Sequence, residues 1–210
     1  MEPTPEDILR AAPVVPVVVI ESLDDALPLA NALLAGGLPV IEVTLRTAVA
    51  LEAISTIACE CPEAIVGAGT VLTPAQFDAA AQSGARFAIS PGASDALYAH
   101  ARGRRLPYLP GVASASEVMR GMEAGYDCFK LFPAEAIGGT ALLKSLAGPF
   151  AGARFCPTGG IDAGNASRYL SLPNVLTVGG SWMLPAEAIR ARDWAHIEAL
   201  AREAAGLARA

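Results

Sequence analysis

A lysine within an apolar run, Lys130, is the residue of this sequence best suited to covalent chemistry. It lies in Cys128-Phe129-Lys130-Leu131-Phe132-Pro133, and it is one of only two lysines among 15 basic residues. Loss of hydration in such a strand disfavours an ammonium relative to the free, nucleophilic amine. A lysine that forms a Schiff base needs this environment. Because a buried ammonium is costly without a partner, the rest of the sequence must supply one.

The partner is expected in the segment Ile41-Glu42-Val43-Thr44-Leu45-Arg46-Thr47. With the two-residue period of a strand, Glu42, Thr44 and Arg46 share one face, and the apolar residues share the other. A Lys130–Glu42 pair would offset the desolvation of both groups and combine a nucleophile with an acid/base. An inert salt bridge in the core is the alternative interpretation.

Short β-rich runs alternate with Ala- and Leu-rich helical patterns along the whole chain. Eight strands are predicted at 14–20, 39–45, 64–67, 86–90, 106–109, 127–132, 154–157 and 174–178. Helices are predicted at 23–35, 48–60, 74–83, 94–102, 114–124, 139–147, 164–171 and 185–208, the last interrupted near Asp193. This alternation indicates parallel strands in an α/β fold, and eight units in 210 residues fit a closed (β/α)₈ TIM barrel.

An open, doubly wound sheet is the structural alternative. It usually carries a glycine-rich turn after its first strand, whereas this strand is followed by Glu21-Ser22-Leu23. The start Thr4-Pro5-Glu6-Asp7 predicts an extra N-terminal helix at about 4–12, which would cover the barrel floor. No linker or change of composition divides the chain, so a single domain over 1–210 is expected.

The ends of the predicted strands carry further polar and glycine residues, where barrel enzymes place their sites. Thr70 follows the third strand and would lie at the mouth beside Arg46. Gly-Gly pairs end the seventh and eighth strands, in Thr158-Gly159-Gly160-Ile161 and Val178-Gly179-Gly180-Ser181. The exposed backbone N–H groups of such glycine-rich loops can bind phosphate. Asp162 would weaken phosphate binding if it pointed at the loop, unless it caps the following helix.

Composition and charge narrow the function further. The net charge of −6 argues against a nucleic-acid or anionic-membrane surface, and no apolar run is long enough to span a membrane. No signal peptide is apparent, so a cytoplasmic location is expected. The four cysteines match no zinc spacing and the two histidines are isolated, so a metal site is not expected.

Several motifs together resemble the 2-dehydro-3-deoxy-phosphogluconate (KDPG) aldolase / 4-hydroxy-2-oxoglutarate aldolase family. They are Glu42-Val43-Thr44-Leu45-Arg46-Thr47, Val66-Gly67-Ala68-Gly69-Thr70-Val71, Ile89-Ser90-Pro91-Gly92, Phe129-Lys130-Leu131-Phe132-Pro133-Ala134-Glu135, Phe155-Cys156-Pro157-Thr158-Gly159-Gly160-Ile161 and Gly179-Gly180-Ser181-Trp182. The resemblance implies a class I aldolase with a (β/α)₈ barrel, usually a homotrimer. Such an enzyme cleaves 2-dehydro-3-deoxy-6-phosphogluconate to pyruvate and glyceraldehyde 3-phosphate in the Entner–Doudoroff pathway.

The resemblance also implies roles for individual residues. Lys130 would form the Schiff base, Glu42 would be the general acid/base, and no metal or other cofactor would be needed. The implied substrate-binding residues are Arg46 and Thr70 for the carboxylate, Pro91 and Phe132 in the pocket, and Gly159, Gly160, Gly180 and Ser181 around the phosphate. The substrate would be a small phosphorylated keto acid.

Three other functions stay open from the sequence. The first is the same chemistry with 4-hydroxy-2-oxoglutarate, giving pyruvate and glyoxylate, as the main activity. The second is a non-catalytic phosphosugar-binding barrel. The third is an isomerase that uses Glu42 alone, which would survive the loss of Lys130.

Overall fold

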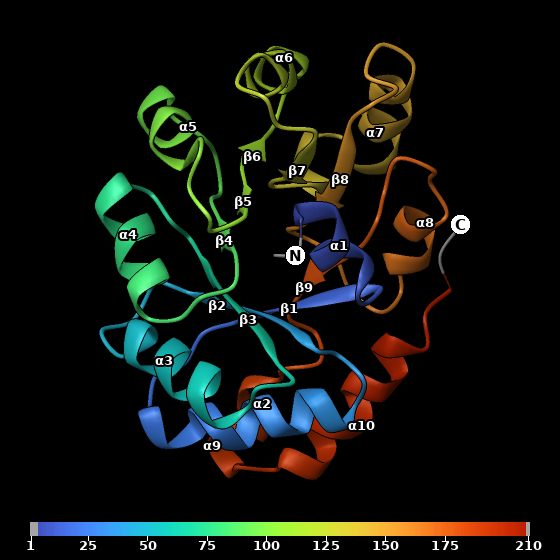
Figure 1. Cartoon of the computed structure of the whole chain (residues 1–210). Coiled ribbons are helices and arrows are strands. Elements are labelled where there is room, and N and C mark those ends of the chain that lie inside the picture. The colour runs from blue at the N-terminus through green and yellow to red at the C-terminus, as the bar shows by residue number, and fades with distance from the viewer. Residues whose placement is uncertain (1–3, 209–210) are drawn as a thin grey trace.

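The computed structural model describes residues 4–208, in which parallel strands form a curled sheet surrounded by helices (Figure 1). The strands are β1 Val14–Val18, β2 Val40–Thr44, β3 Ile65–Gly69, β4 Ala88–Ile89, β5 Tyr108–Leu109, β6 Gly111–Val112, β7 Cys128–Leu131, β8 Arg154–Pro157 and β9 Val178–Gly180. The α/β class and the parallel direction of the strands, both predicted from the sequence, are confirmed.

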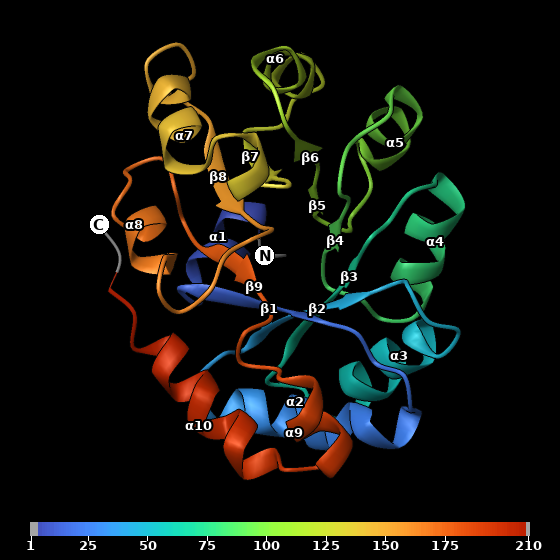
Figure 2. The same ribbon diagram turned by 180° about the vertical axis from the view of Figure 1, so that it is seen from behind.

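The helices alternate with the strands, and all except α1 line the outside of the sheet in the front and rear views (Figures 1 and 2). They are α1 Pro5–Arg10, α2 Ala26–Ala35, α3 Ala50–Glu60, α4 Pro74–Gln82, α5 Asp95–Ala101, α6 Ala115–Glu123, α7 Gly139–Ala147, α8 Ala166–Leu170, α9 Ala186–Ala191 and α10 Trp194–Ala205, with 3₁₀ turns η1 Leu23–Asp25 and η2 Glu135–Ile137. The predicted interruption of the last helix is confirmed: Asp193 separates α9 from α10 and accepts a hydrogen bond from His196 N.

The strands pair in two sheets. The larger has the order β5-β4-β3-β2-β1-β9, and the smaller has the order β6-β7-β8. Only Pro110, which has no N–H to donate, separates β5 from β6. Isolated parallel bridges, Phe155 to Val175 and Thr158 to Gly179, link β8 to the segment that ends in β9.

Residues 4–208 contain nine strands where eight were predicted, because the short strand β6 was not expected, and most strand ends differ from the prediction by one or two residues. The third strand runs on to Gly69, and the last strand is β9 at 178–180 instead of 174–178. Asn174 belongs to a turn, because Val175 N donates to Leu172 O at 3.0 Å and Asn174 Nδ2 donates to Leu143 O. Val175 therefore makes a single bridge, and regular pairing with β1 starts at Val178.

Alternation along each strand divides the core into two apolar clusters. The larger one joins the strands to the helices around them, and the smaller one is inside the curl of the sheet. The inner cluster consists of Ile8, Leu9, Val15, Val40, Phe87, Ile89, Leu109, Cys128, Cys156 and Leu176.

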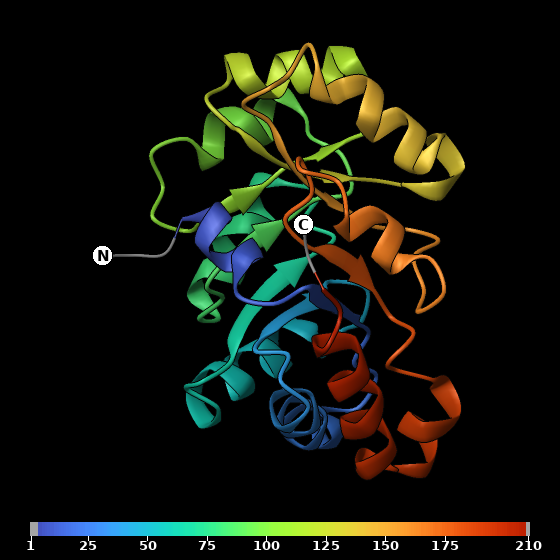
Figure 3. The same cartoon turned by 90° about the vertical axis from the view of Figure 1, so that its right-hand side faces the viewer.

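Helix α1 closes one end of the inner cluster. Thr4 caps it and accepts a hydrogen bond from Asp7 N, and Ile8 and Leu9 are buried. The side view shows α1 at one end of the strands (Figure 3). Since Glu42 and Lys130 come two residues after the inner-cluster residues Val40 and Cys128, the polar site lies further toward the carboxyl ends of the strands. Among residues 4–208, no helix has both the length and the apolar character needed to cross a membrane.

Candidate active site

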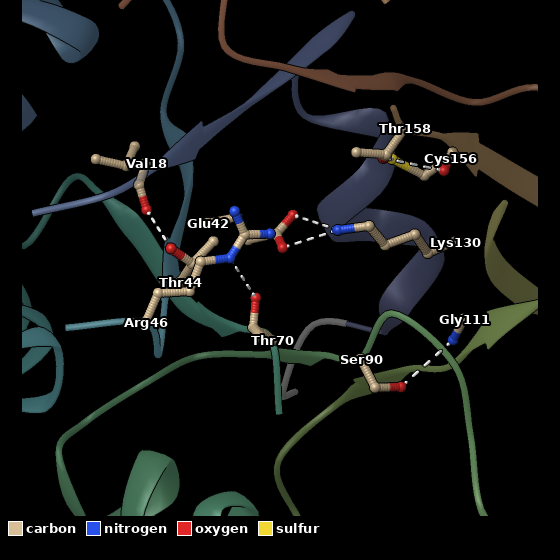
Figure 4. Close-up of polar contacts among 10 residues, drawn as sticks. All are labelled: Val18, Glu42, Thr44, Arg46, Thr70, Ser90, Gly111, Lys130, Cys156 and Thr158. Atoms are coloured by element: carbon tan, nitrogen blue, oxygen red, sulfur yellow. Dashed lines mark hydrogen bonds and ion pairs between the residues drawn. The ribbon is translucent and has the colours of Figure 1, made fainter. Parts of the chain in front are cut away.

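The centre of the site is a buried ion pair between β7 and β2. Lys130 Nζ donates to Glu42 Oε1 at 2.9 Å and to Oε2 at 3.3 Å. Only 6% of Lys130 and 1% of Glu42 is exposed. The close-up shows the two side chains reaching toward each other (Figure 4). The predicted pairing is confirmed, and it joins the three-stranded sheet to the six-stranded one.

A glycine on the neighbouring strand leaves room for the Glu42 carboxylate. A Cβ added to Gly69 would lie 2.2 Å from Glu42 Oε1 and 2.6 Å from its Cγ. No side chain larger than hydrogen therefore fits beside Glu42 without displacing it. Gly69 pairs with Thr44 of β2, so the backbone of β3 runs directly beside the strand that carries Glu42.

Arg46 and Thr70 meet at the outer end of these strands, as predicted (Figure 4). Arg46 Nε donates to Thr70 Oγ1 at 3.3 Å. Thr70 has a φ of 58°, in the left-handed region that β-branched residues rarely adopt. Backbone strain of this kind is concentrated at functional sites. The guanidinium is exposed and can receive an anionic group at the mouth of the site.

Phe132, Cys156 and Thr158 surround the Lys130 side chain. Lys130 Nζ is 5.7 Å from the centroid of the Phe132 ring. Cys156 pairs with Lys130 across β7 and β8, and its Sγ is 3.9 Å from Thr158 Oγ1. Burial raises the pKa of the Cys156 thiol to about 12, with a smaller opposing effect of Lys130. The thiol is therefore protonated at neutral pH and acts as an uncharged wall of the site.

Both glycine pairs are at one end of the sheet, close to each other. The bridge between Thr158 and Gly179 brings them together, and a Cβ on Gly179 would lie 2.3 Å from Thr158 Oγ1. Gly159 and Gly160 have φ values of 98° and 78°, which only glycine adopts without strain. Within residues 4–208, the N–H groups of Gly159 and Gly160 donate to no protein acceptor.

The second glycine loop, which follows β9, ends at the exposed residue Ser181. It contains Gly180, whose hydrogen faces the Trp182 ring. A Cβ on Gly180 would lie 2.1 Å from that ring. A cavity of about 730 Å³ opens beside Ser181, between the segment after β1 and helix α9. Neither the ion pair nor any of the loop glycines lines it, and Ser181 is the residue that it shares with the glycine loops.

Asp162 supports the backbone of the following turn. Its Oδ1 accepts hydrogen bonds from Gly164 N at 2.8 Å and Asn165 N at 3.0 Å. Asn165 in turn donates from Nδ2 to Gly160 O. The carboxylate therefore holds the turn that leads into α8 and does not cap the helix itself, whose N-cap residue is Asn165.

Pro91 lies where β4 ends and is packed against the strand that follows β5. A Cβ on Gly111 would lie 2.3 Å from the Pro91 carbonyl carbon. Buried Ser90 holds this junction, because its Oγ accepts from Gly111 N and bonds Tyr108 Oη at 2.6 Å. Among the described residues, no group of three or more His, Cys, Asp or Glu side chains could hold a metal ion.

The chain matches a family model described as KDPG and KHG aldolase over residues 6–200. It belongs to this family. The KHG/KDPG aldolase of Escherichia coli K12 is 53% identical over 199 residues, covering 95% of this chain and 93% of the relative. The 2-dehydro-3-deoxy-phosphogluconate aldolase of Dickeya dadantii is 54% identical with the same coverage.

A solved relative within the family is the KDPG aldolase of Legionella pneumophila, whose structure has pyruvate captured at low pH as a covalent carbinolamine intermediate. It is 48% identical, with a TM-score of 0.96, and the match covers 98% of this chain and 100% of that one. A carbinolamine is the adduct of an amine and a carbonyl group, so its capture is direct evidence for amine chemistry in that relative.

Two side chains near the glycine loops of this KDPG and KHG aldolase family member were not predicted from the sequence. Tyr169 on α8 donates a hydrogen bond to Glu135 Oε1, and Glu135 packs against Gly160. No periodic pattern marks either residue, because Glu135 lies in a 3₁₀ turn and Tyr169 in a helix of only five residues.

Proposed function

We propose that this chain is a class I aldolase that cleaves 2-dehydro-3-deoxy-6-phosphogluconate to pyruvate and glyceraldehyde 3-phosphate. One observation carries the proposal: Lys130 Nζ lies 2.9 Å from Glu42 Oε1, and both residues are buried. The named activities of relatives at 53% and 54% identity support the same assignment.

The reaction begins with the free amine of Lys130 attacking the C2 carbonyl carbon of the substrate. Glu42 passes the proton that the Lys130 ammonium gave up to the C2 oxygen. It then takes a proton from the nitrogen of the adduct and passes it to the same oxygen, which leaves as water and gives a protonated imine. This imine is a much better electron acceptor than the original ketone. It therefore takes the place of a metal ion or other cofactor in promoting cleavage.

Cleavage of the C3–C4 bond sends its electron pair to the imine nitrogen, which leaves an enamine on Lys130. A base removes the proton of the C4 hydroxyl in the same step, and glyceraldehyde 3-phosphate is released as the aldehyde. Protonation of the enamine at C3 and addition of water then release pyruvate and regenerate the amine. Glu42 is the carboxylate within reach of these proton transfers.

The other predicted residues hold the two charged ends of the substrate. Arg46 and Thr70 bind the carboxylate next to C2, which keeps the ketone over Lys130. The remaining contacts come from Phe132 and Pro91 along the pocket, and from Gly159, Gly160, Gly180 and Ser181 around the phosphate. The free N–H groups of the glycine loop support the phosphate assignment, because amide donors supply local positive field without a charged side chain.

We also propose that the described sheets are parts of one closed (β/α)₈ barrel that forms a single domain. The separation of β5 and β6 by Pro110 alone and the bridges from β8 toward β9 support closure. Helix α1 would cover its floor. The enzyme is expected to work in the cytoplasm as a homotrimer.

Borohydride trapping with pyruvate tests the catalytic assignment. Reduction of the imine should leave a pyruvate-derived adduct on the Lys130 peptide of the wild type, detected by mass spectrometry. The Lys130→Met variant should give no adduct and no cleavage. An adduct on Lys144, or cleavage that survives in Lys130→Met, would contradict the proposal.

The second candidate is the same chemistry with 4-hydroxy-2-oxoglutarate as the main substrate, and the double name of the Escherichia coli relative favours it. This substrate has no phosphate. Ser181→Asp places a negative charge at the phosphate loop, so it should damage cleavage of the phosphorylated substrate and leave release of glyoxylate nearly unchanged. A wild-type preference for 4-hydroxy-2-oxoglutarate would move this candidate to first place.

A further inference from the structure

The Gly159–Gly160 loop rests against the turn that follows Lys130. Ala134 N donates to Thr158 O at 2.8 Å, and Glu135 N donates to Gly159 O at 3.1 Å. The aliphatic part of Glu135 covers Gly160 closely, since a Cβ on Gly160 would lie 2.7 Å from Glu135 Cβ. The position of the loop therefore depends on where η2 places Glu135.

A buried tyrosine fixes the Glu135 side chain. Tyr169, on α8, is fully buried and donates its hydroxyl to Glu135 Oε1. Burial, together with the neighbouring Glu135 carboxylate, raises the pKa of the Tyr169 hydroxyl, so the tyrosine stays a donor at all ordinary pH values. The hydroxyl also lies near Gly139, where an added Cβ would be 2.7 Å from it. No larger residue fits there without moving the hydroxyl.

A second contact holds the same loop from the other side. Asn165 donates to Gly160 O at 2.8 Å, next to the start of α8. Helix α8 therefore supports the loop twice, through Asn165 to the backbone of Gly160 and through Tyr169 to the side chain that covers it. Such support matters because a site must be held within a fraction of an ångström to bind its ligand well.

We propose that Glu135 and Tyr169 are positioning residues for the phosphate of the substrate, an inference that rests on the proposed function. Neither residue touches the reacting atoms in this scheme. The Tyr169–Glu135 hydrogen bond holds the Gly159–Gly160 loop in the conformation in which its free N–H groups converge on the phosphate. Its loss lowers affinity for phosphorylated substrates and leaves the chemistry at Lys130 intact.

Steady-state kinetics with two substrates test this role. In Tyr169→Phe, KM for 2-dehydro-3-deoxy-6-phosphogluconate should rise about tenfold, the loss expected for a hydrogen bond to a charged group. Its kcat should change less than about twofold, and kcat/KM for 4-hydroxy-2-oxoglutarate, which has no phosphate, should be unchanged. Tyr98→Phe is the matched control, because Tyr98 is a buried tyrosine on α5 and should alter neither reaction.

Two Glu135 variants complete the test. Glu135→Gln keeps the covering stem and an acceptor oxygen, so it should retain most of the affinity for the phosphorylated substrate. Glu135→Ala should match Tyr169→Phe, and the double variant should be no worse than either, since both residues act through one contact.

Equal losses with both substrates would assign Tyr169 and Glu135 a purely structural role and overturn the inference. Additive losses in the double variant, or wild-type KM values in Tyr169→Phe, would overturn it as well. If Tyr169→Phe does not fold, Glu135→Ala and Glu135→Gln decide the question alone. A wild type that cleaves neither substrate would instead refute the proposed function.

Discussion

Replacing both members of the Lys130–Glu42 pair should restore most of the stability that either single replacement removes. In Glu42→Leu, the ammonium of Lys130 stays in a site where only 6% of the residue is exposed, and its counter-charge is gone. In Lys130→Met, the carboxylate of Glu42 is left alone in the same way. Breaking a buried pair by removing one partner typically costs about 3–5 kcal/mol.

The geometry of the pair sets the size of the effect. At the 2.9 Å separation of Nζ and Oε1, the Coulomb attraction is about 6 kcal/mol for an effective dielectric constant near 20. The free-energy cost of desolvating the two ions is of similar size and offsets this attraction, so the intact pair contributes little net stability. The double variant Glu42→Leu/Lys130→Met should therefore unfold within about 2 kcal/mol of the wild type, with a coupling energy of about 3 kcal/mol or more.

Urea unfolding of the four proteins, followed by circular dichroism at one protein concentration, measures this cycle. The exposed pair of Arg202 and Glu198 on α10 is the control, and its coupling should be below about 0.5 kcal/mol. Single variants that each lose less than about 1 kcal/mol and add in the double variant would refute the reasoning. That result would mean that water solvates the pair in the folded protein.

Three other predictions follow from close contacts and from pKa shifts. Gly69→Ala should push the Glu42 carboxylate away and lower kcat about a hundredfold, a typical loss for a misplaced acid/base, while circular dichroism stays unchanged. Gly160 has a φ of 78°, and a methyl group added there would lie 2.7 Å from Glu135 Cβ. Gly160→Ala should therefore distort the glycine loop and raise KM for the phosphorylated substrate only, which kinetics with both substrates will measure. Because burial raises the pKa of Cys156 to about 12, its thiolate is scarce at pH 8 and becomes common only as the pH approaches 12. Iodoacetamide at pH 8 should therefore label exposed Cys59 alone in the native protein, and all four cysteines in guanidinium, by intact mass.

Most of the strands, and the meeting of Lys130 with Glu42, could be predicted from the sequence because both depend on the two-residue period of a strand. Once Glu42 is on the face opposite Ile41 and Val43, it must point into the curl of the sheet. The same holds for Lys130 between Phe129 and Leu131. The pairing then needs only that both strands contribute to one interior, which the β/α alternation indicates.

The start of the last strand was predicted wrongly because the turn at Asn174 depends on contacts that no local pattern reveals. Its apolar residues suit a strand, yet Asn174 donates to Leu143 on α7 and holds the chain in a turn. Tertiary contacts of this kind override β-propensity. The Tyr169–Glu135 contact could not be predicted from the sequence for a related reason. It joins residues separated by 34 positions, and neither lies in an amphipathic pattern.

In the proposed mechanism, the Lys130–Glu42 pair serves both stability and catalysis through one contact. A buried lysine needs a carboxylate to offset its desolvation, and an imine-forming lysine needs an acid/base beside its amine. In the proposed mechanism Glu42 meets both needs, because its oxygens lie 2.9 and 3.3 Å from Nζ. Since the pair also bridges β2 of the larger sheet and β7 of the smaller, a substitution that abolishes the chemistry at either position also weakens the junction of the sheets. Loss of activity in a single variant is therefore ambiguous, and the apolar double variant, folded but inactive, separates the catalytic role from the structural one.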